Sequence, residues 1–264
     1  MRVVFVAALM ADLLFAVACG SSRIAGGNQQ AMGQPSTAPL FAGWPPVMVW
    51  AWQRPEDLSF INPQRVGVSY LVKTIQLKGE GMIVQPNLNG LKVPVGTKVM
   101  ACARIEIDPS SPPLLSPQRA QEAAIQLASL AGFPDAKAVQ VDFDATASQQ
   151  NFYGTLLIEL RRRLARSFPL SITALGSWCM GDDWIAHLPI DEAVPMLFRM
   201  GPDRASILLR LAAGDDFEEP LCRQSGGIST DEPVPRLPAG RRLYIFNPDG
   251  WTEASLEKVT AGIK

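Results

Sequence analysis

Short apolar runs alternate with amphipathic stretches along the chain from Phe41 onward. Runs of four to eight β-branched, aliphatic or aromatic residues predict buried strands, whereas apolar residues spaced three and four apart predict helices. The pattern predicts strands over residues 47–52, 66–72, 98–107, 138–144, 170–176 and 243–247. It predicts helices from Ser116, from Ser148 and from Asp191 to Met200, and over residues 204–213 and 251–263.

The first two of these helices have N-terminal signals. Ser116 is of a type that caps helices, and Pro117 after it suits the first helical position. The apolar stripe that follows consists of Ala120, Ala123, Ala124, Leu127 and Ala131. Small alanines would let this helix lie close to a sheet. For the second helix we predict Ser148 as the cap, with an apolar stripe of Phe152, Tyr153, Leu156, Leu157, Leu160 and Leu164.

Two segments interrupt the alternation. Residues 74–95 contain Gly79, Gly81 and the pair Asn89-Gly90 between short extended pieces, which predicts a hairpin. Residues 214–240 contain Asp215, Asp216, Glu218 and Glu219 together with several prolines, so we expect loops there.

Repeated strand–helix units favour a parallel sheet with helical crossovers. We therefore predict one α/β domain over residues 41–264, an imperfect (β/α) TIM-like barrel with a β-hairpin excursion. The segment is short for eight full units, which take about 250 residues. An open doubly wound sheet is the alternative, although no glycine-rich phosphate turn follows the first strand.

The N-terminal segment has the pattern of an export signal. Arg2 precedes an apolar run from Val3 to Ala18, broken by Asp12, and small residues precede Cys19. Residues 1–19 thus resemble a bacterial lipoprotein signal, with lipidation at Cys19 and residues 20–40 as a flexible tether. Ordinary cleavage near Ala18 is the alternative. We expect an exported protein that is periplasmic or anchored in the outer membrane by lipid alone, or else secreted.

The composition and net charge of the chain limit the classes of ligand and partner that it is expected to bind. The net charge is −1, and the basic run Arg161–Arg163 lies within an amphipathic helix pattern, so nucleic acid is a poor candidate. The chain has one histidine, His187, and no CxxC motif, which argues against a zinc site and a serine hydrolase triad. We expect no metal and no cofactor.

If the protein is exported, its cysteines enter an oxidising compartment, and their positions then indicate a possible disulfide. Cys102 lies in a strand-like run, where a buried thiol is the simplest interpretation. Cys179 and Cys222 lie in loop-like regions, and an oxidising compartment permits a disulfide between them. We predict this disulfide.

Two strands carry polar side chains on a single face. Because side chains alternate along a strand, Gln140, Asp142 and Asp144 share a face, and the apolar face must pack under helices. The strand before it has the same arrangement in Arg104, Glu106 and Asp108. An inward polar stripe at the carboxyl end of a barrel strand predicts a functional site. The alternative is a buried ion-pair network that only fixes the structure.

The segment 138–176 resembles the central part of chitinase-type (family eighteen) glycoside hydrolases, in which a DxxDxDxE strand precedes a helix. Asp142 and Asp144 match the last two aspartates of that motif, whereas Val139 replaces the first aspartate and Thr146 the catalytic acid. The chain also resembles an uncharacterised bacterial family of predicted barrel proteins through residues 140–144, 175–178, 191–196, 198–201 and 246–248. These resemblances imply a barrel with glycosidase kinship.

Aromatic residues near strand ends favour a sugar ligand. Trp50, Trp52, Trp178 and Trp251 each lie at or just after a predicted strand, where indole rings can stack on sugars. Packing in the core or at the rim is the alternative for each. Asn247, at the end of the last strand, is a further predicted ligand contact.

Two functions remain in view. In a glycan-processing enzyme, Asp144 would be the carboxylate that assists the reaction or orients the substrate. The deeper Asp142 would adjust the protonation of Asp144 by sharing a proton with it. The acid missing at Thr146 would then come from Glu106, Asp108 or the pair Asp182 and Asp183. The alternative is a non-catalytic cell-envelope lipoprotein that binds glycan or a protein, or has a structural role.

Overall fold

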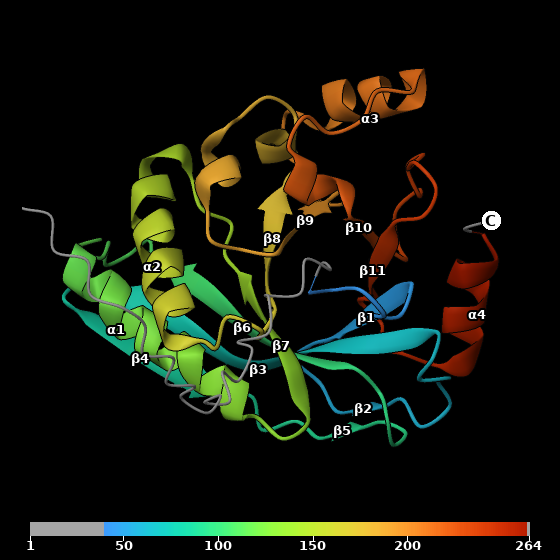
Figure 1. Ribbon diagram of the computed structural model, residues 1–264, viewed down its shortest axis with the longest axis horizontal. Helices are drawn as coiled ribbons and strands as arrows, with labels where there is room; N and C mark the ends of the chain where they lie inside the picture. The colour runs from blue at the N-terminus through green and yellow to red at the C-terminus, as the bar shows by residue number, and fades with distance from the viewer. Residues whose placement is uncertain (1–39, 263–264) are drawn as a thin grey trace, which may run out of the picture. The chain divides into compact units, whose positions relative to one another are not determined.

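The computed structural model describes residues 40–262, which fold into a closed barrel of eight parallel strands with helices between them (Figure 1). The barrel strands are β1 (Val47–Ala51), β3 (Val66–Lys78), β6 (Val99–Ile107), β7 (Ala136–Asp142), β8 (Leu170–Leu175), β9 (Glu192–Met196), β10 (Ser225–Ser229) and β11 (Arg242–Phe246). Each neighbours the next in this order, and β11 returns to β1.

Closure depends on β1, which has a parallel partner on both sides. Val49 lies opposite Ile245 of β11 and opposite Val68 of β3. The pairing of β1 with both β3 and β11 closes the parallel sheet into a barrel, so none of the eight strands is an edge strand. The (β/α) barrel expected from the sequence is therefore confirmed, and the alternative of an open doubly wound sheet is wrong.

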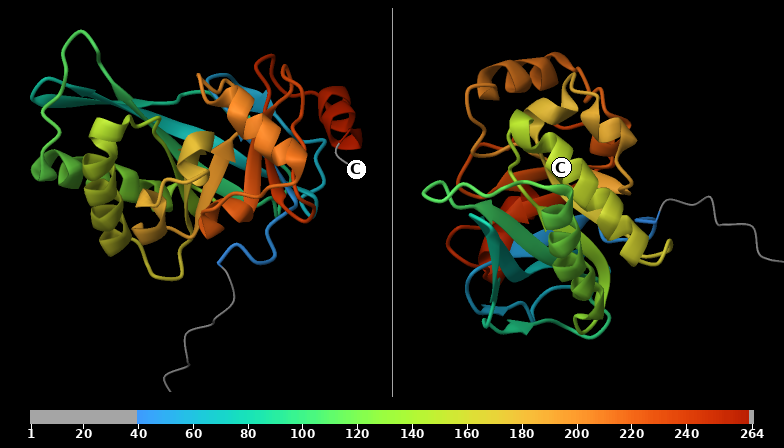
Figure 2. Two further views of the ribbon diagram at one scale, coloured as in Figure 1. Left: turned by 90° about the horizontal axis from the view of Figure 1, so that it is seen from above. Right: turned by 90° about the vertical axis from the view of Figure 1, so that its left-hand side faces the viewer.

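Four α-helices cover the outside in the described part of the chain. They are α1 (Pro117–Ala128), α2 (Gln150–Arg163), α3 (Arg204–Ala213) and α4 (Glu253–Ala261). Helices α1 and α2 lie side by side on one flank, and α4 lies on the opposite flank (Figures 1 and 2). After β8 the chain makes only short 3₁₀ turns, so the barrel is imperfect as predicted. No helix within residues 40–262 is both long and apolar enough to span a membrane.

The hairpin excursion is also present. β3 continues past the barrel and pairs antiparallel with β4 (Gly81–Pro86), with Ile75 opposite Val84. A separate two-stranded sheet joins β2 (Glu56–Asp57) to β5 (Leu91–Lys92). These pieces occupy the positions where a regular barrel would place its first two helices.

The two predicted helix starts differ in outcome. Ser116 caps α1 as expected, since its hydroxyl accepts the N–H of Arg119 at 3.2 Å. The start of α2 was predicted wrongly, because Ser148 lies inside a 3₁₀ turn over Ala147–Gln149. The residue before that turn is Thr146, whose N–H donates to the Gln149 side chain at 2.9 Å.

The helix predicted from Asp191 to Met200 is wrong, because the chain forms β9 there. Asp191 begins no helix. Its carboxylate accepts the N–H of Leu170 at 2.8 Å and pairs with Arg161 at 3.2 Å, which fastens the start of β8 to α2. Alanine and methionine in a five-residue run look helical in isolation, and only the pairing of β9 with β8 overrides that preference.

Strand β10 was missed within the segment expected to be loops. Its sequence, Ser-Gly-Gly-Ile-Ser, carries little of the β-branched or aromatic signal of a strand. A Cβ atom on Gly227 would lie 3.0 Å from the indole of Trp50, so the barrel interior requires a small residue there.

The amino ends of the strands are closed by polar contacts. Arg242, the first residue of β11, donates to the carbonyl oxygens of Phe41 at 2.8 Å and Pro45 at 3.3 Å. Its guanidinium also pairs with the fully buried Glu192 at 2.6 Å. These contacts close the amino end of the barrel interior around β9 and β11.

Candidate functional site at the mouth of the barrel

A cavity of about 670 Å³ lies at the carboxyl ends of the barrel strands. Its volume falls in the range of sites for small ligands, and its position is that of active sites in (β/α) barrels. One side is polar and comes from β6, β7 and β8. The other side is largely aromatic and comes from β1, β9 and β11.

Asp142, the last residue of β7, forms the deepest part of the polar side. One carboxylate oxygen accepts the hydroxyl of Thr173 at 2.8 Å, and the other pairs with Arg104 at 3.1 Å. Only 6% of the side chain is exposed. Asp142 is therefore held in place by side chains from two neighbouring strands, and only a small part of its surface is exposed to the cavity.

Asp144 lies two residues further along and nearer the solvent. Its side chain is 49% exposed, and its nearest cation is the guanidinium of Arg104 at 4.0 Å. No hydrogen-bond donor within residues 40–262 reaches this carboxylate. Asp144 is thus the more available of the two carboxylates toward a ligand.

Burial alters the protonation of both groups. It raises the pKa of Asp142 from 3.8 to about 6, against the lowering effect of Arg104, while Asp144 nearby adds to the rise. Burial also raises the pKa of Asp144, again opposed by Arg104. Both carboxyl groups therefore keep a proton to a higher pH than an ordinary aspartate does.

Glu106 and Asp108 continue along β6 beyond the cavity. Glu106 accepts a hydrogen bond from Arg104 at 2.9 Å but does not line the cavity. Asp108 pairs with Lys78 at 3.2 Å and accepts the hydroxyl of Ser110 at 2.6 Å. The structure therefore brings Glu106 to the edge of the site through Arg104 and leaves Asp108 outside.

Trp50 forms the floor of the cavity. Its indole N–H donates to the side chain of Gln140 at 2.8 Å, and its ring lies above Gly227. Gln140 also accepts the hydroxyl of Ser69 at 2.8 Å and donates to Ser171 at 3.1 Å. Gln140 thus lies beneath the floor, fully buried, where it fixes Trp50 and has no access to a ligand.

The aromatic wall consists of Trp52, Phe198 and Phe246. The two phenylalanine rings are stacked, with centroids 5.9 Å apart and an angle of 6° between their planes. Trp52 meets Phe246 edge to face at 6.4 Å. Arg199 lies over the pair, with its guanidinium carbon 5.2 Å from the centroid of Phe246.

Five other predicted contacts lie away from the cavity. Trp178 is buried against Trp184 in an aromatic cluster outside the barrel, with ring centroids 4.9 Å apart. Trp251 donates its indole N–H to the carbonyl of Trp50 at 2.9 Å, and Asn247 accepts the hydroxyl of Thr230 at 3.0 Å. Asp182 accepts from Gln150 at 3.1 Å, and Asp183 precedes a 3₁₀ turn. None of them lines the cavity. Their positions correspond to packing and loop structure.

Several cavity residues were not predicted. Phe198 and Arg199 belong to a segment that carries the family resemblance, but the helix wrongly predicted over residues 191–200 placed them away from any strand end. Thr173 was recognisable from alternation along the strand over 170–176. Arg54 and Asp203 lie in connecting segments, where no sequence pattern indicates which way a side chain points.

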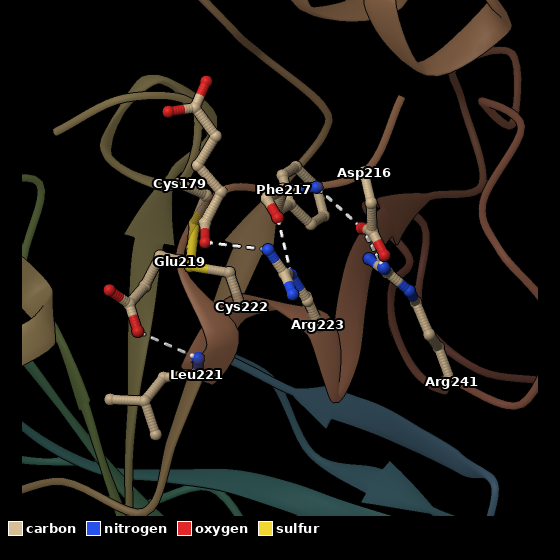
Figure 3. The surroundings of a disulfide bond; sticks show 9 residues. Cys179, Asp216, Phe217, Glu219, Leu221, Cys222, Arg223 and Arg241 are labelled. Atoms are coloured by element: carbon tan, nitrogen blue, oxygen red, sulfur yellow. Dashed lines mark hydrogen bonds and ion pairs between the residues drawn. A yellow bond between two sulfur atoms is a disulfide. The ribbon is translucent and has the colours of Figure 1, made fainter. Parts of the chain in front are cut away.

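The predicted disulfide between Cys179 and Cys222 is present, with Cα atoms 5.9 Å apart (Figure 3). It fastens the turn after β8 to the turn before β10. Arg223 strengthens the same loop by donating to the carbonyl oxygens of Phe217 at 2.6 Å and Glu218 at 2.9 Å, and Arg241 pairs with Asp216. Cys102 is a buried free thiol, and burial raises its pKa well above the usual value. The predicted lipidation site, Cys19, lies outside the described residues.

The arrangement offers acid–base chemistry and stacking. Within residues 40–262, no three His, Cys, Asp or Glu side chains gather as metal ligands. The cavity instead combines a buried carboxyl group that titrates near neutral pH, an exposed carboxylate and a wall of aromatic rings. No protein-family model and no curated protein sequence matches this chain, so the site's function is inferred from its geometry.

Proposed function

We propose that this protein binds a carbohydrate in the mouth of its barrel and acts on it as a glycosidase-like protein. One observation carries the proposal: Asp142 and Asp144 line the same cavity as the aromatic side chains of Trp52 and Phe246. Sugar rings present apolar C–H faces to aromatic rings and hydroxyl groups to carboxylates. A cavity with one wall of each kind suits such a ligand.

In this proposal the two carboxylates have different roles. Asp144 is exposed and free of hydrogen-bond donors in the described structure, so it contacts the ligand directly. Asp142 is held by Arg104 and Thr173, and it tunes Asp144 by sharing a proton. Trp52 and the stacked pair of Phe198 and Phe246 support the sugar ring from the opposite side.

The alternative is a binding protein without catalysis, and Thr146 favours it. In the resembling hydrolases this position holds the acid that protonates the leaving oxygen. Here Thr146 is exposed, precedes the 3₁₀ turn before α2 and does not line the cavity. Glu106 is the nearest replacement, but it is bound to Arg104 at the edge of the site.

Export belongs to the same proposal. The apolar run before Cys19 is the basis for it, and the disulfide supports it because disulfides persist in oxidising compartments. Labelling with a palmitate analogue should mark the wild type and spare Cys19→Ser. Equal labelling of both proteins would contradict lipidation.

A glycan array followed by turnover assays on the bound glycans tests the function. We expect the full-length protein to bind at least one glycan and Asp144→Asn to lose that binding or its turnover. Asp183→Asn is the matched control, because it removes an equivalent exposed charge outside the cavity. Binding without turnover would favour the non-catalytic alternative, and no binding to any glycan would reject both.

A further inference from the structure

We propose that the ligand is a saccharide with a protonated amine, such as a glycan containing unacetylated glucosamine. This inference rests on the proposed function and specifies its substrate class. It follows from the charges that line the cavity and from which of them already have partners.

The cationic side chains of the cavity are all occupied. Arg104 pairs with Glu106 at 2.9 Å and with Asp142 at 3.1 Å. Arg199 pairs with Asp231 at 3.0 Å. Arg54 donates to the carbonyl of Pro248 and lies 4.0 Å from the buried carboxylate of Glu56. Arg104 and Arg199 therefore have close carboxylate partners, and Arg54 is held by a backbone carbonyl.

The carboxylates of the cavity are not all occupied. Asp144 has only the distant contact with Arg104 at 4.0 Å. Asp203, at the start of α3, also lines the cavity, and no donor among residues 40–262 reaches its carboxylate. The two free charges that a ligand meets are therefore negative, and they come from the segment after β7 and from the residue before α3.

The local charge balance has the same sign. The lining holds three arginines and three aspartates, and Glu106 and Asp231 outside it pair with Arg104 and Arg199. Carboxylates therefore outnumber the arginines around the cavity. Such a field attracts cations and disfavours acidic saccharides, which Asp144 and Asp203 would repel.

The aromatic wall supports a cationic ligand independently. A cation over a phenylalanine ring is attracted by the negative face of the ring. Arg199 already lies in this way, 5.2 Å from the centroid of Phe246 and 5.8 Å from that of Phe198. The wall thus already accommodates one cation, and an amino sugar that stacked on Trp52 would direct its ammonium group to the free carboxylates.

Matched oligosaccharides test the inference. Tetramers of glucosamine and of N-acetylglucosamine, each in β-1,4 and β-1,6 linkage, and a neutral glucose tetramer are titrated into the full-length protein by calorimetry. The buffer is mildly acidic, so the amines are protonated. We expect a glucosamine tetramer to bind at least about tenfold more tightly than its acetylated counterpart, because a hydrogen bond to a charged group changes affinity by roughly 10- to 100-fold.

Asp203→Asn should reduce this preference about tenfold and leave affinity for the acetylated tetramer unchanged. The Asp203 side chain accepts no hydrogen bond from the N–H groups of α3, so the substitution should leave the helix intact. Asp183→Asn is the control and should keep the full preference. Equal or tighter binding of acetylated or neutral tetramers would overturn the substrate class and leave the proposed function standing. Absence of binding to every tetramer and to the glycan array would overturn both.

Discussion

Arg104 contacts three carboxylates, and its geometry separates their roles. Glu106 lies 2.9 Å away and Asp142 3.1 Å away, whereas Asp144 lies 4.0 Å away. The two close partners satisfy the guanidinium and leave Asp144 directed to the cavity. A buried cation between carboxylates is commonly a structural device, but here one of the three is only loosely tied to it.

Asp144→Asn should therefore have little effect on stability. An ion pair at 4.0 Å to a half-exposed side chain contributes at most about 1 kcal/mol, and relieving repulsion with Asp142 offsets part of that. We expect a free energy of unfolding within about 1 kcal/mol of the wild type, measured by urea titration. A loss of about 3–5 kcal/mol would instead identify Asp144 as a structural partner of Arg104.

Asp142 should make the folded state less stable as the pH rises. Burial raises its pKa in the folded state to about 6, against 3.8 for an ordinary aspartate. The folded state therefore holds the proton more tightly than the unfolded chain. The resulting stabilisation is complete below about pH 3.8 and is lost as the pH rises through about 6.

The measurement compares the wild type with Asp142→Asn by urea unfolding at about pH 7 and about pH 5. Between these two values, the wild type should gain about 1 kcal/mol more than the variant. Subtracting the variant removes the contributions of other titrating groups. An equal pH response of the two proteins would mean that Asp142 is ionised across this range.

At the scale of elements, β10 shows how the site constrains a strand. Trp50 of β1 crosses the barrel interior to reach Gln140 of β7, and its ring also fills the space beside Gly227 of β10. A side chain at this position would displace the floor of the cavity. The glycine at position 227, which weakens the strand signal of residues 225–229, is therefore a consequence of the indole that the barrel interior must accommodate.

Gly227→Ala should destabilise the protein by about 1–3 kcal/mol, since the added Cβ would lie 3.0 Å from the indole and 3.3 Å from the carbonyl of Pro195. It should also change the tryptophan fluorescence as Trp50 shifts. Gly90→Ala is the control, because nothing lies within 4 Å of its new Cβ. Equal stability of both variants would show that the floor tolerates movement.

For the whole molecule, the barrel has a closed end and an open end. Arg242, Glu192 and Tyr244 form a buried polar network near the amino ends of the strands, where the hydroxyl of Tyr244 donates to Glu192 at 2.7 Å. The opposite end opens into the cavity, which the start of α3 also lines. The disulfide joins the turn after β8 to the turn before β10.

Replacing both Cys179 and Cys222 by serine should cost about 4 kcal/mol, because the disulfide closes a loop across a separation of 43 residues. Urea unfolding of the oxidised wild type and the double variant measures this difference. Mass spectrometry of unreduced peptides from protein exported to the periplasm should show the linked pair. Free thiols at both positions would contradict the assignment.

The sequence by itself determined the barrel class, the strand that ends at Asp142, the cap at Ser116 and the pairing of Cys179 with Cys222. These features follow from local periodicity, from alternation along a strand and from the small number of cysteines. Alternation needs no knowledge of neighbours, so it placed Gln140 and Asp142 on the interior face correctly.

Only the tertiary structure decided which side chains reach the cavity. Trp178 and Trp251 follow strands as Trp52 does, yet they pack into the core, because the direction of a loop depends on contacts distant in sequence. The same is true of β9 and β10, whose short segments become strands through pairing with their neighbours. Arg54, Arg199 and Asp203 meet only when β1, β9 and α3 come together at the mouth. The charge balance of the cavity depends on side chains that are distant in the sequence. The sequence alone therefore does not predict it.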